Sequence, residues 1–536
     1  MSTPTGVRVV ETDGMSATGQ VERGLPPALS LREYASSFRL TLVGIALAIF
    51  GVFLPTIIVP YAFSDDYTDL WMAVSGEPTA QFGKNIIDAS AITGRPFSGL
   101  LIQWLFSAAG TIDNLRFVRL FGVVTIVALA LLLHWALVRS RVRSTPAALI
   151  AVFVCSLPAF QVYGSWAVLF SAPLAALLAG GASLFAVAAV DGPRDLVRDR
   201  LLGAVALLLA GLLTYQPGAM FFWVFFAVAL VGALESSDRA LRLMRTHFAV
   251  GGVALVLAYA EIKFTVLVMG DETRGAARNH LTHDVAGKAR WFFDEPLYRS
   301  LNLFDLTPSR WFAALVAVVA AGGMLLWLLR RGARPLLYAV VAVILVPLTY
   351  LPNLVVTENW AAYRTQVSIS ALIALYACFG ALGIWLTVRD WLRARFSLRA
   401  MRASERLALA ISVVFVAASV VVAAKNVLTL FVEPHITEQR MLRSQVAALP
   451  DGAPRVAFVL TDWHGGLTDL VAYDEFGLPS SVRQWTLEPA VDLILRDEGR
   501  LTFDGPRPAV DIYQSGTTSF PKGEPVIDLR GLADLR

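Results

Sequence analysis

Charged residues are scarce in this sequence. Of its 536 residues, only 16% are Asp, Glu, Lys or Arg, whereas 56% are hydrophobic and the mean hydropathy is +0.61. Soluble globular chains carry about 25% charged residues, and a soluble protein of this length divides into several domains with polar surfaces. The shortage of charge therefore excludes a soluble multi-domain enzyme. It also excludes a disordered chain, which needs low hydrophobicity and high net charge.

Cysteine and the short motifs of many soluble enzymes are also scarce or missing. The two cysteines, Cys155 and Cys378, lie inside apolar stretches and provide no disulfide framework. The sequence has no Walker A loop, no GxSxG elbow, no HExxH helix and no CxxC pair. Basic and aromatic residues are not interleaved as they are in nucleic-acid-binding proteins, so we expect no nucleic-acid partner.

The net charge of +4 is the balance of two unequal parts of the chain. From residue 434 onward there are 15 acidic and 10 basic residues, which gives a net charge of −5. The first 433 residues therefore carry a net charge of +9. A basic membrane part joined to a mildly acidic tail indicates membrane topology rather than nucleic-acid binding.

Long apolar runs fill the chain between residues 40 and 432. Because about 20 apolar residues span a bilayer as a helix, we predict a polytopic α-helical membrane protein with about eleven spans. The fifth and sixth spans meet at Thr214-Tyr215-Gln216-Pro217 as a tight hairpin or one broken helix, which changes the count by one. The predicted spans are 40–60, 117–138, 146–165, 167–190, 201–215, 217–234, 248–269, 311–329, 335–351, 366–388 and 407–432.

Arginine-rich loops all fall on one side of the predicted bundle. They are 139–143, 194–200, 239–245, 330–334 and 389–406. By the positive-inside rule this side is cytoplasmic, so we expect a cytoplasmic N-terminus and, with an odd number of spans, an extracytoplasmic C-terminal tail. The outer side then receives residues 61–116, 270–310, 352–365 and 433–536.

Three parts of the chain follow from this pattern. Residues 1–38 are polar and without apolar periodicity, which predicts a mostly disordered cytoplasmic leader rather than a signal peptide. Residues 39–432 form the transmembrane domain, in which 97–110 is apolar but too short to span and predicts a juxtamembrane or re-entrant helix. Residues 433–536 contain a predicted buried strand at 455–460 and turns, which predicts a small extracytoplasmic α/β domain.

Two adjacent carboxylates follow the first predicted span. Asp65 and Asp66 lie just where the chain leaves the membrane, and carboxylates near hydrocarbon usually have a partner or a role. One is a candidate general base for an acceptor hydroxyl, with its pKa raised by burial and by its neighbour. The other could orient the acceptor or help to hold a divalent cation. The alternative is a solvated pair at a helix cap.

Two interruptions of the apolar pattern lie at the same outer depth. Arg95 directly precedes the predicted juxtamembrane helix and is a candidate bidentate partner of a phosphate, or an ordinary loop arginine. Tyr215 and Gln216 break an apolar run, so their backbone must find partners or line a cavity, unless they form a plain membrane turn.

A short outer loop adds an acid and a base. Glu358, Tyr363 and Arg364 lie on it and are candidates for substrate contact or for an internal ion pair. Carboxylates and arginines around a pocket at membrane level would suit an anionic lipid phosphate and a hydroxyl acceptor.

These residues, in this order, resemble a known superfamily. The first outer loop with Ser64-Asp65-Asp66 resembles the acidic motif of the GT-C integral-membrane glycosyltransferases, in which juxtamembrane helices follow that loop. The motifs Gly94-Arg95-Pro96, Tyr215-Gln216 and Tyr363-Arg364 are similar to those of bacterial glucosyltransferases that modify O-antigen. The resemblance covers about residues 40–390, and the role of the tail stays open.

The resemblance implies an enzyme that takes a sugar from a polyprenyl-phosphate-linked donor. The acceptor would be a hydroxyl on a cell-envelope glycan or glycolipid at the outer face of the bacterial inner membrane. Asp65 or Asp66 would be the base, and Arg95 and Arg364 would stabilise the departing phosphate. Tyr215 and Gln216 would line the donor cavity. A divalent cation, Mg²⁺ or Mn²⁺, is a candidate cofactor, and the sugar and the acceptor are not encoded in any motif.

Two other classes of protein compete with this interpretation. A transporter or lipid flippase would suit Glu261 and Lys263 inside a span, but such proteins often contain an internal repeat with paired broken helices. No such repeat is evident in the sequence. A non-catalytic envelope assembly protein would use the tail as an interaction module on an inert membrane anchor.

Overall fold

The computed structural model describes residues 34, 36–78, 84–269, 280–303, 306, 309–331, 334–395, 398–460, 475–502, 506–521 and 523–534. The chain divides into two units, residues 1–39 and residues 40–536, and the features discussed below lie in the second. Residues 1–33 and 35 of the predicted leader lie outside the described residues.

The first half of the described chain is helical throughout. Its helices are α2 (Arg39–Ile58), α3 (Asp65–Ser75), α4 (Ile86–Ile92), α5 (Pro96–Ala109), α6 (Leu115–Arg139), α7 (Ser144–Cys155), α8 (Pro158–Ser165), η1 (Ala167–Phe170), α9 (Ser171–Asp191), η2 (Arg194–Leu196), α10 (Val197–Thr214), α11 (Gln216–Ala219), α12 (Phe221–Val231) and α13 (Ser237–Met269).

The second half adds further helices and a small sheet. Its helices are α15 (Val285–Phe292), η3 (Phe293–Leu297), α16 (Tyr298–Leu301), α17 (Arg310–Val318), η4 (Val319–Gly323), α18 (Met324–Arg331), α19 (Pro335–Leu348), α20 (Leu351–Val355), η5 (Tyr363–Thr365), α21 (Val367–Arg395), α22 (Leu398–Val427), η6 (Leu428–Val432), α23 (Glu433–Ala447), η7 (Ser480–Val482), α24 (Gln484–Asp497) and η8 (Arg530–Asp534). The strands are β1 (Arg455–Val459), β2 (Ala509–Tyr513) and β3 (Val526–Asp528).

The helices are those of a multi-pass membrane protein. Within the described ranges, seven helices are long and apolar enough to cross a membrane, or eight if α7 and α8, bent by 63°, form one span. The predicted count of eleven is therefore not confirmed. The other three predicted spans contain α10, with three charged residues in its first turn, and two apolar helices shorter than 18 residues, Gln216–Val231 and Pro335–Leu348.

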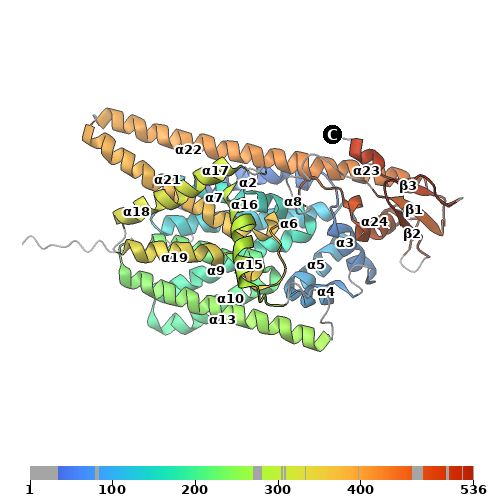
Figure 1. Ribbon diagram of the computed structural model, residues 1–536, viewed down its shortest axis with the longest axis horizontal. Helices are drawn as coiled ribbons and strands as arrows, with labels where there is room; N and C mark the ends of the chain where they lie inside the picture. Colours follow the sequence, from blue (N-terminus) through green and yellow to red (C-terminus); the bar gives the residue numbers. More distant parts are fainter. Residues whose placement is uncertain are drawn as a thin grey trace, which may run out of the picture. The chain divides into compact units, whose positions relative to one another are not determined.

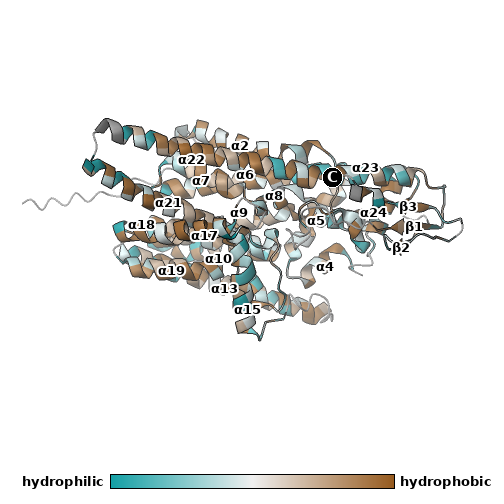
Figure 2. Cartoon of the chain, turned by 45° about the horizontal axis from the view of Figure 1, so that its top comes forward, coloured by the Kyte–Doolittle hydropathy of each residue, from teal (hydrophilic) through white to brown (hydrophobic). Residues whose placement is uncertain are grey.

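Several of these helices are apolar along their length, and polar residues gather elsewhere. Figure 2 shows apolar colour along α2, α6, α7 and α21, and polar colour where α21 and α22 meet and along α15. The helix α12 lies in the centre of the bundle, because every residue from Phe221 to Leu230 is buried. A helix that is apolar on all sides and buried on all sides needs no solvent-facing stripe.

Most of the elements that were predicted to lie outside the membrane gather at one end of the bundle, whereas α15 and α16, from the predicted outer segment 270–310, lie beside its middle. Figure 1 shows α3, α4, α5, α24 and the sheet at this end, and the end of α21 and the start of α22 at the opposite end. The predicted juxtamembrane segment 97–110 is the helix α5, which begins at Pro96. It ends before Gly110, a residue in the left-handed conformation with φ 68°. Proline at the first helical position and glycine after the last are the usual helix boundaries.

The tail contains the expected combination of helices and strands. The three strands are parallel in the order β2-β1-β3, and β1 coincides with the strand predicted at 455–460. The predicted boundary at residue 432 falls at the junction of η6 and α23, where the helix continues without interruption. The division of the chain into two domains at this point stays a prediction.

Candidate active site

The candidate site begins where α2 ends and α3 starts. Ser64, the residue before α3, has φ 52° and ψ −120°, a conformation that residues with a side chain rarely adopt. Its N–H donates to the hydroxyl of Ser480 in the tail at 2.9 Å. Strained backbone persists only where the surrounding structure fixes it, and it gathers at functional sites.

Asp66 is fully buried and both of its carboxylate oxygens are in use. Oδ2 accepts from the N–H of Phe63 at 3.0 Å, and Oδ1 accepts from the N–H of Val168 at 2.8 Å. Burial raises the pKa of Asp66 to about 7, although the nearby guanidinium of Arg119 and the two backbone donors oppose this rise. The carboxylate connects the start of α3 to η1. Because it is fully buried, an acceptor hydroxyl cannot reach it.

Asp65 is partly exposed and keeps one oxygen open. Its Oδ1 accepts from the indole N–H of Trp485 at 3.0 Å and from the hydroxyl of Ser64 at 3.2 Å. No residue in the described part of the chain donates to Oδ2. A general base needs an oxygen within reach of the proton that it takes, so geometry is considered before pKa. The geometry favours Asp65 over Asp66, a choice that the sequence left open.

Arg119 of α6 is a buried cation that the sequence analysis missed. Its Nε donates to the carbonyl of Thr56 at 2.8 Å and its Nη1 to that of Tyr61 at 2.9 Å. Carbonyls in the last turn of a helix have no partner within the helix, so Arg119 closes the end of α2 and supplies a positive charge near Asp66. The detectable signal was a lone arginine inside the predicted span 117–138.

Arg95 meets two predicted residues, Tyr215 and Gln216, that lie far from it in the sequence. The Nε of Arg95 donates to Oε1 of Gln216 at 3.0 Å, and the guanidinium lies 4.7 Å from the ring centre of Tyr215. The side chain of Gln216 also donates to the carbonyl of Gly94 at 2.7 Å. Gly94 has φ 72°, and a Cβ there would lie 2.5 Å from Cγ1 of Ile262 and 3.0 Å from Nε2 of Gln216, so glycine suits this position.

Tyr163 of α8 links this cluster to the second predicted arginine. Its ring lies 5.9 Å from that of Tyr215, and its hydroxyl donates to the carbonyl of Arg364 at 2.7 Å. The charges of Arg95 and Arg364 both act on this hydroxyl. The two arginines therefore flank one pair of tyrosines and concentrate positive charge there.

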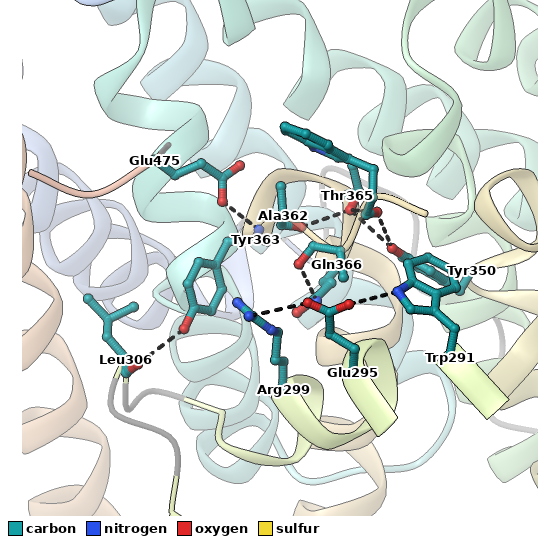
Figure 3. A network of polar contacts seen from close by, with 12 residues as sticks. Trp291, Glu295, Arg299, Leu306, Tyr350, Ala362, Tyr363, Thr365, Gln366 and Glu475 are labelled. Atoms are coloured by element: carbon teal, nitrogen blue, oxygen red, sulfur yellow. Dashed lines mark hydrogen bonds and ion pairs between the residues drawn. The ribbon is translucent and has the colours of Figure 1, made fainter. Parts of the chain in front are cut away.

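Hydrogen bonds fix the backbone of the loop 360–366 (Figure 3). Three side chains donate to its backbone carbonyls. Tyr350 donates to the carbonyl of Trp360 at 2.6 Å, Thr365 to that of Ala362 at 2.8 Å and Gln366 to that of Ala361 at 2.6 Å. Because buried backbone groups need partners, a loop with so many of them satisfied is held in one conformation. The backbone of Arg364, from which its side chain extends, is therefore held in place.

The guanidinium of Arg364 lies against two indole rings and a carboxylate. Its Cζ is 4.8 Å from the ring centre of Trp166 and 5.5 Å from that of Trp360. Its buried Nη1 lies 3.5 Å from Oε1 of Glu475, yet it makes no hydrogen bond with any residue that the structure describes. A buried donor without an acceptor costs free energy, and a phosphate oxygen would fit this donor.

A tail segment, residues 475–485, joins the loop of Arg364 to the aspartates. Glu475 contacts Arg364 at one end, and the indole of Trp485 donates to Asp65 at the other. The middle of the segment is fixed by Glu438 of α23, whose carboxylate accepts from two successive N–H groups, at 2.9 Å and 2.6 Å. No sequence motif indicated these contacts.

Tyr363 and Glu358, the remaining predicted residues, support the loop. The N–H of Tyr363 donates to Glu475, and its hydroxyl donates to the carbonyl of Leu306 at 3.4 Å. The backbone carbonyl of Glu358 accepts from the Nζ of Lys288 at 2.6 Å. The carboxylate that pairs with Arg364 comes from Glu475 and not from this loop.

A divalent cation at the two aspartates is the candidate cofactor that the sequence suggests. The described ranges contain no group of three or more His, Cys, Asp or Glu residues that could hold a metal ion. Both oxygens of Asp66 accept from backbone N–H groups, and one oxygen of Asp65 accepts from an indole and a hydroxyl. A role for Mg²⁺ or Mn²⁺ stays a prediction from the sequence.

No protein-family model and no curated protein matches the sequence. Among solved structures, the chain is similar to the oligosaccharyltransferase AglB from Archaeoglobus fulgidus in complex with an inhibitory peptide and a dolichol-phosphate. The TM-score is 0.43 at 14% identity, over 82% of this chain and 64% of AglB. The chain thus spans less than two thirds of the length of that enzyme.

A second similar structure is that of ArnT from Cupriavidus metallidurans bound to undecaprenyl phosphate. The TM-score is 0.47 at 12% identity, over 89% of this chain and 90% of ArnT.

Proposed function

We propose that the protein transfers a sugar from a polyprenyl-phosphate-linked donor to an acceptor hydroxyl. The acceptor belongs to a cell-envelope glycan or glycolipid at the outer face of the bacterial inner membrane. The observation that carries the proposal is the buried Nη1 of Arg364, which lacks a hydrogen-bond acceptor among the described residues. The donor phosphate supplies that acceptor.

The proposed reaction is a single displacement at the anomeric carbon. Asp65 takes the proton of the acceptor hydroxyl as the acceptor oxygen forms its bond to that carbon. The bond between the anomeric carbon and the phosphate oxygen breaks, and its electron pair leaves with the polyprenyl phosphate. The configuration inverts because only one displacement occurs. No step is routed through a cation.

Two arginines oppose the charge that develops on the leaving phosphate. Donors and positive charges that are in place before the reaction stabilise such charge without reorganisation. Arg364 is fixed by its loop and two indoles, and Arg95 is fixed by its hydrogen bond to Gln216 and its contact with Tyr215. In the proposal Tyr215 and Gln216 line the donor side of the site.

The membrane orientation belongs to the same proposal. The arginine-rich loops support a cytoplasmic N-terminus and an extracytoplasmic tail. The candidate site lies at the end of the bundle that carries α3, α5 and the sheet, which is the outer end in this orientation. A polyprenyl-linked donor would reach such a site laterally from the bilayer.

Deletion of the gene followed by mass spectrometry of the envelope glycans tests the proposal. We expect one glycan or glycolipid species to lose the mass of one sugar residue, and a wild-type copy of the gene to restore it. Envelope glycans that are unchanged in the deletion strain would contradict the proposal. A substrate-uptake assay in proteoliposomes separates the transporter alternative, because a transferase moves no substrate across the bilayer.

A further inference from the structure

We infer that Glu475, in the C-terminal tail, is a positioning residue that sets the guanidinium of Arg364 for the phosphate of the donor. The inference rests on the proposed function and goes beyond it, because it makes the tail part of the phosphate-binding site. The sequence resemblance ends near residue 390 and assigns nothing to the tail.

The carboxylate of Glu475 holds both the backbone and the side chain of Arg364. It is fully buried, and it accepts from the N–H of Tyr363 and, at 3.0 Å, from the N–H of Arg364. Figure 3 shows its carboxylate pointing toward the backbone of Tyr363. The same carboxylate lies 3.5 Å from Nη1 of Arg364. Two attachments to one residue fix the direction in which its side chain leaves the loop.

The geometry leaves the guanidinium available to an anion. A separation of 3.5 Å is too long for a strong charge-assisted hydrogen bond, which is usually 2.7–2.9 Å. The bonds that Glu475 accepts from the N–H groups of Tyr363 and Arg364 are both shorter than its separation from Nη1. Glu475 therefore orients Arg364 without forming a hydrogen bond to its Nη1.

The chain supplies a matched control for this role. Glu438 is also fully buried and also accepts from two successive backbone N–H groups, those of Ser480 and Ser481. It fastens the same tail segment to α23, and the ionisable side chain beside it is the imidazole of His435 rather than an arginine. A change at Glu438 therefore loosens the tail without acting directly on Arg364.

Binding of undecaprenyl phosphate to the full-length protein in nanodiscs tests the inference, with undecaprenol as the uncharged control lipid. We expect Glu475→Gln to weaken binding of the phosphate at least about tenfold, because small displacements of a positioned group have large effects. We expect Glu438→Gln to change it less than about twofold, although both variants lower the thermal unfolding temperature. Both substitutions keep the shape of the side chain and remove its charge.

A double-mutant cycle identifies the residue through which Glu475 acts. In an Arg364→Gln background, Glu475→Gln should cause no further loss of binding, since coupled residues are not additive. Equal losses in Glu475→Gln and Glu438→Gln, unchanged or tighter binding in Glu475→Gln, or additive losses in the cycle would each overturn the inference. Wild-type protein that does not prefer undecaprenyl phosphate to undecaprenol would instead refute the proposed phosphate site, and the inference with it.

Discussion

Replacing Asp65 with Asn is expected to reduce sugar transfer about 10²–10⁴-fold, the range that a general base contributes. The substitution removes the proton acceptor and keeps the size of the side chain. The amide oxygen of Asn can still accept from the indole of Trp485, so the protein should reach the membrane at its normal level. The measurement is the restored mass of the envelope glycan in a deletion strain that carries the variant, together with an immunoblot of the membranes.

Two neighbouring substitutions serve as comparisons for Asp65→Asn. Asp113→Asn changes an exposed carboxylate in a surface ion pair with Arg443, and such pairs contribute little to stability. It should leave transfer and protein level unchanged. Asp66→Asn should instead lower the protein level, because Arg119 loses a buried negative neighbour and a buried N–H loses its acceptor. Transfer at the wild-type rate in Asp65→Asn would contradict the assignment of the base.

Replacing Arg364 with Gln is expected to lower transfer about 10²–10³-fold, the usual effect of removing one preorganised donor for developing charge. The fold should survive, because Glu475 keeps two backbone N–H donors when the guanidinium is gone. Lys at this position should restore only part of the activity, since it supplies charge without the planar fork of donors. Transfer is measured as for Asp65, and binding of undecaprenyl phosphate is measured separately.

The surface partner of Asp113 provides the control for Arg364. Arg443→Gln removes a partly exposed arginine at the same end of the molecule, so it should change neither transfer nor lipid binding. If Arg364→Gln bound undecaprenyl phosphate as tightly as the wild type, the contact of Arg364 with Glu475 would be a structural ion pair. The phosphate would then have to be held by other groups.

Much of the fold could be predicted because a membrane helix is indicated by a local run of apolar residues. Each predicted span contains a helix, and the strand at 455–460 was found from its apolar run. The number of spans could not be predicted, because α10, α12 and α19 are short or begin with charged residues. Whether a short apolar helix crosses the bilayer or is enclosed by protein depends on its neighbours and not on its own sequence.

The candidate site was predictable only in parts. Charges and helix breaks at the membrane boundary indicated Asp65, Asp66, Arg95 and Gln216, because polar residues are costly there. That Arg95 meets Gln216 requires the packing of α5 against α10, which no local pattern encodes. The distinction between Asp65 and Asp66 depends on which backbone N–H groups lie nearby.

The contribution of the tail could not be predicted at all. Glu475 and Trp485 belong to a segment without periodicity, and each acts on a residue more than 100 positions away, Arg364 or Asp65. The sequence does not distinguish a buried carboxylate from an exposed one. Its role becomes visible only when its hydrogen-bond partners are known.

The central claim is that the protein consumes a polyprenyl-phosphate-linked sugar and that Asp65 is required for it. Mass spectrometry of membrane lipid extracts tests this directly in deletion strains carrying either the wild-type gene or Asp65→Asn. We expect one polyprenyl-phosphate-linked sugar to accumulate with the variant and to fall when the wild-type gene is present. Equal amounts of every such lipid in the two strains, with both proteins in the membrane, would contradict it.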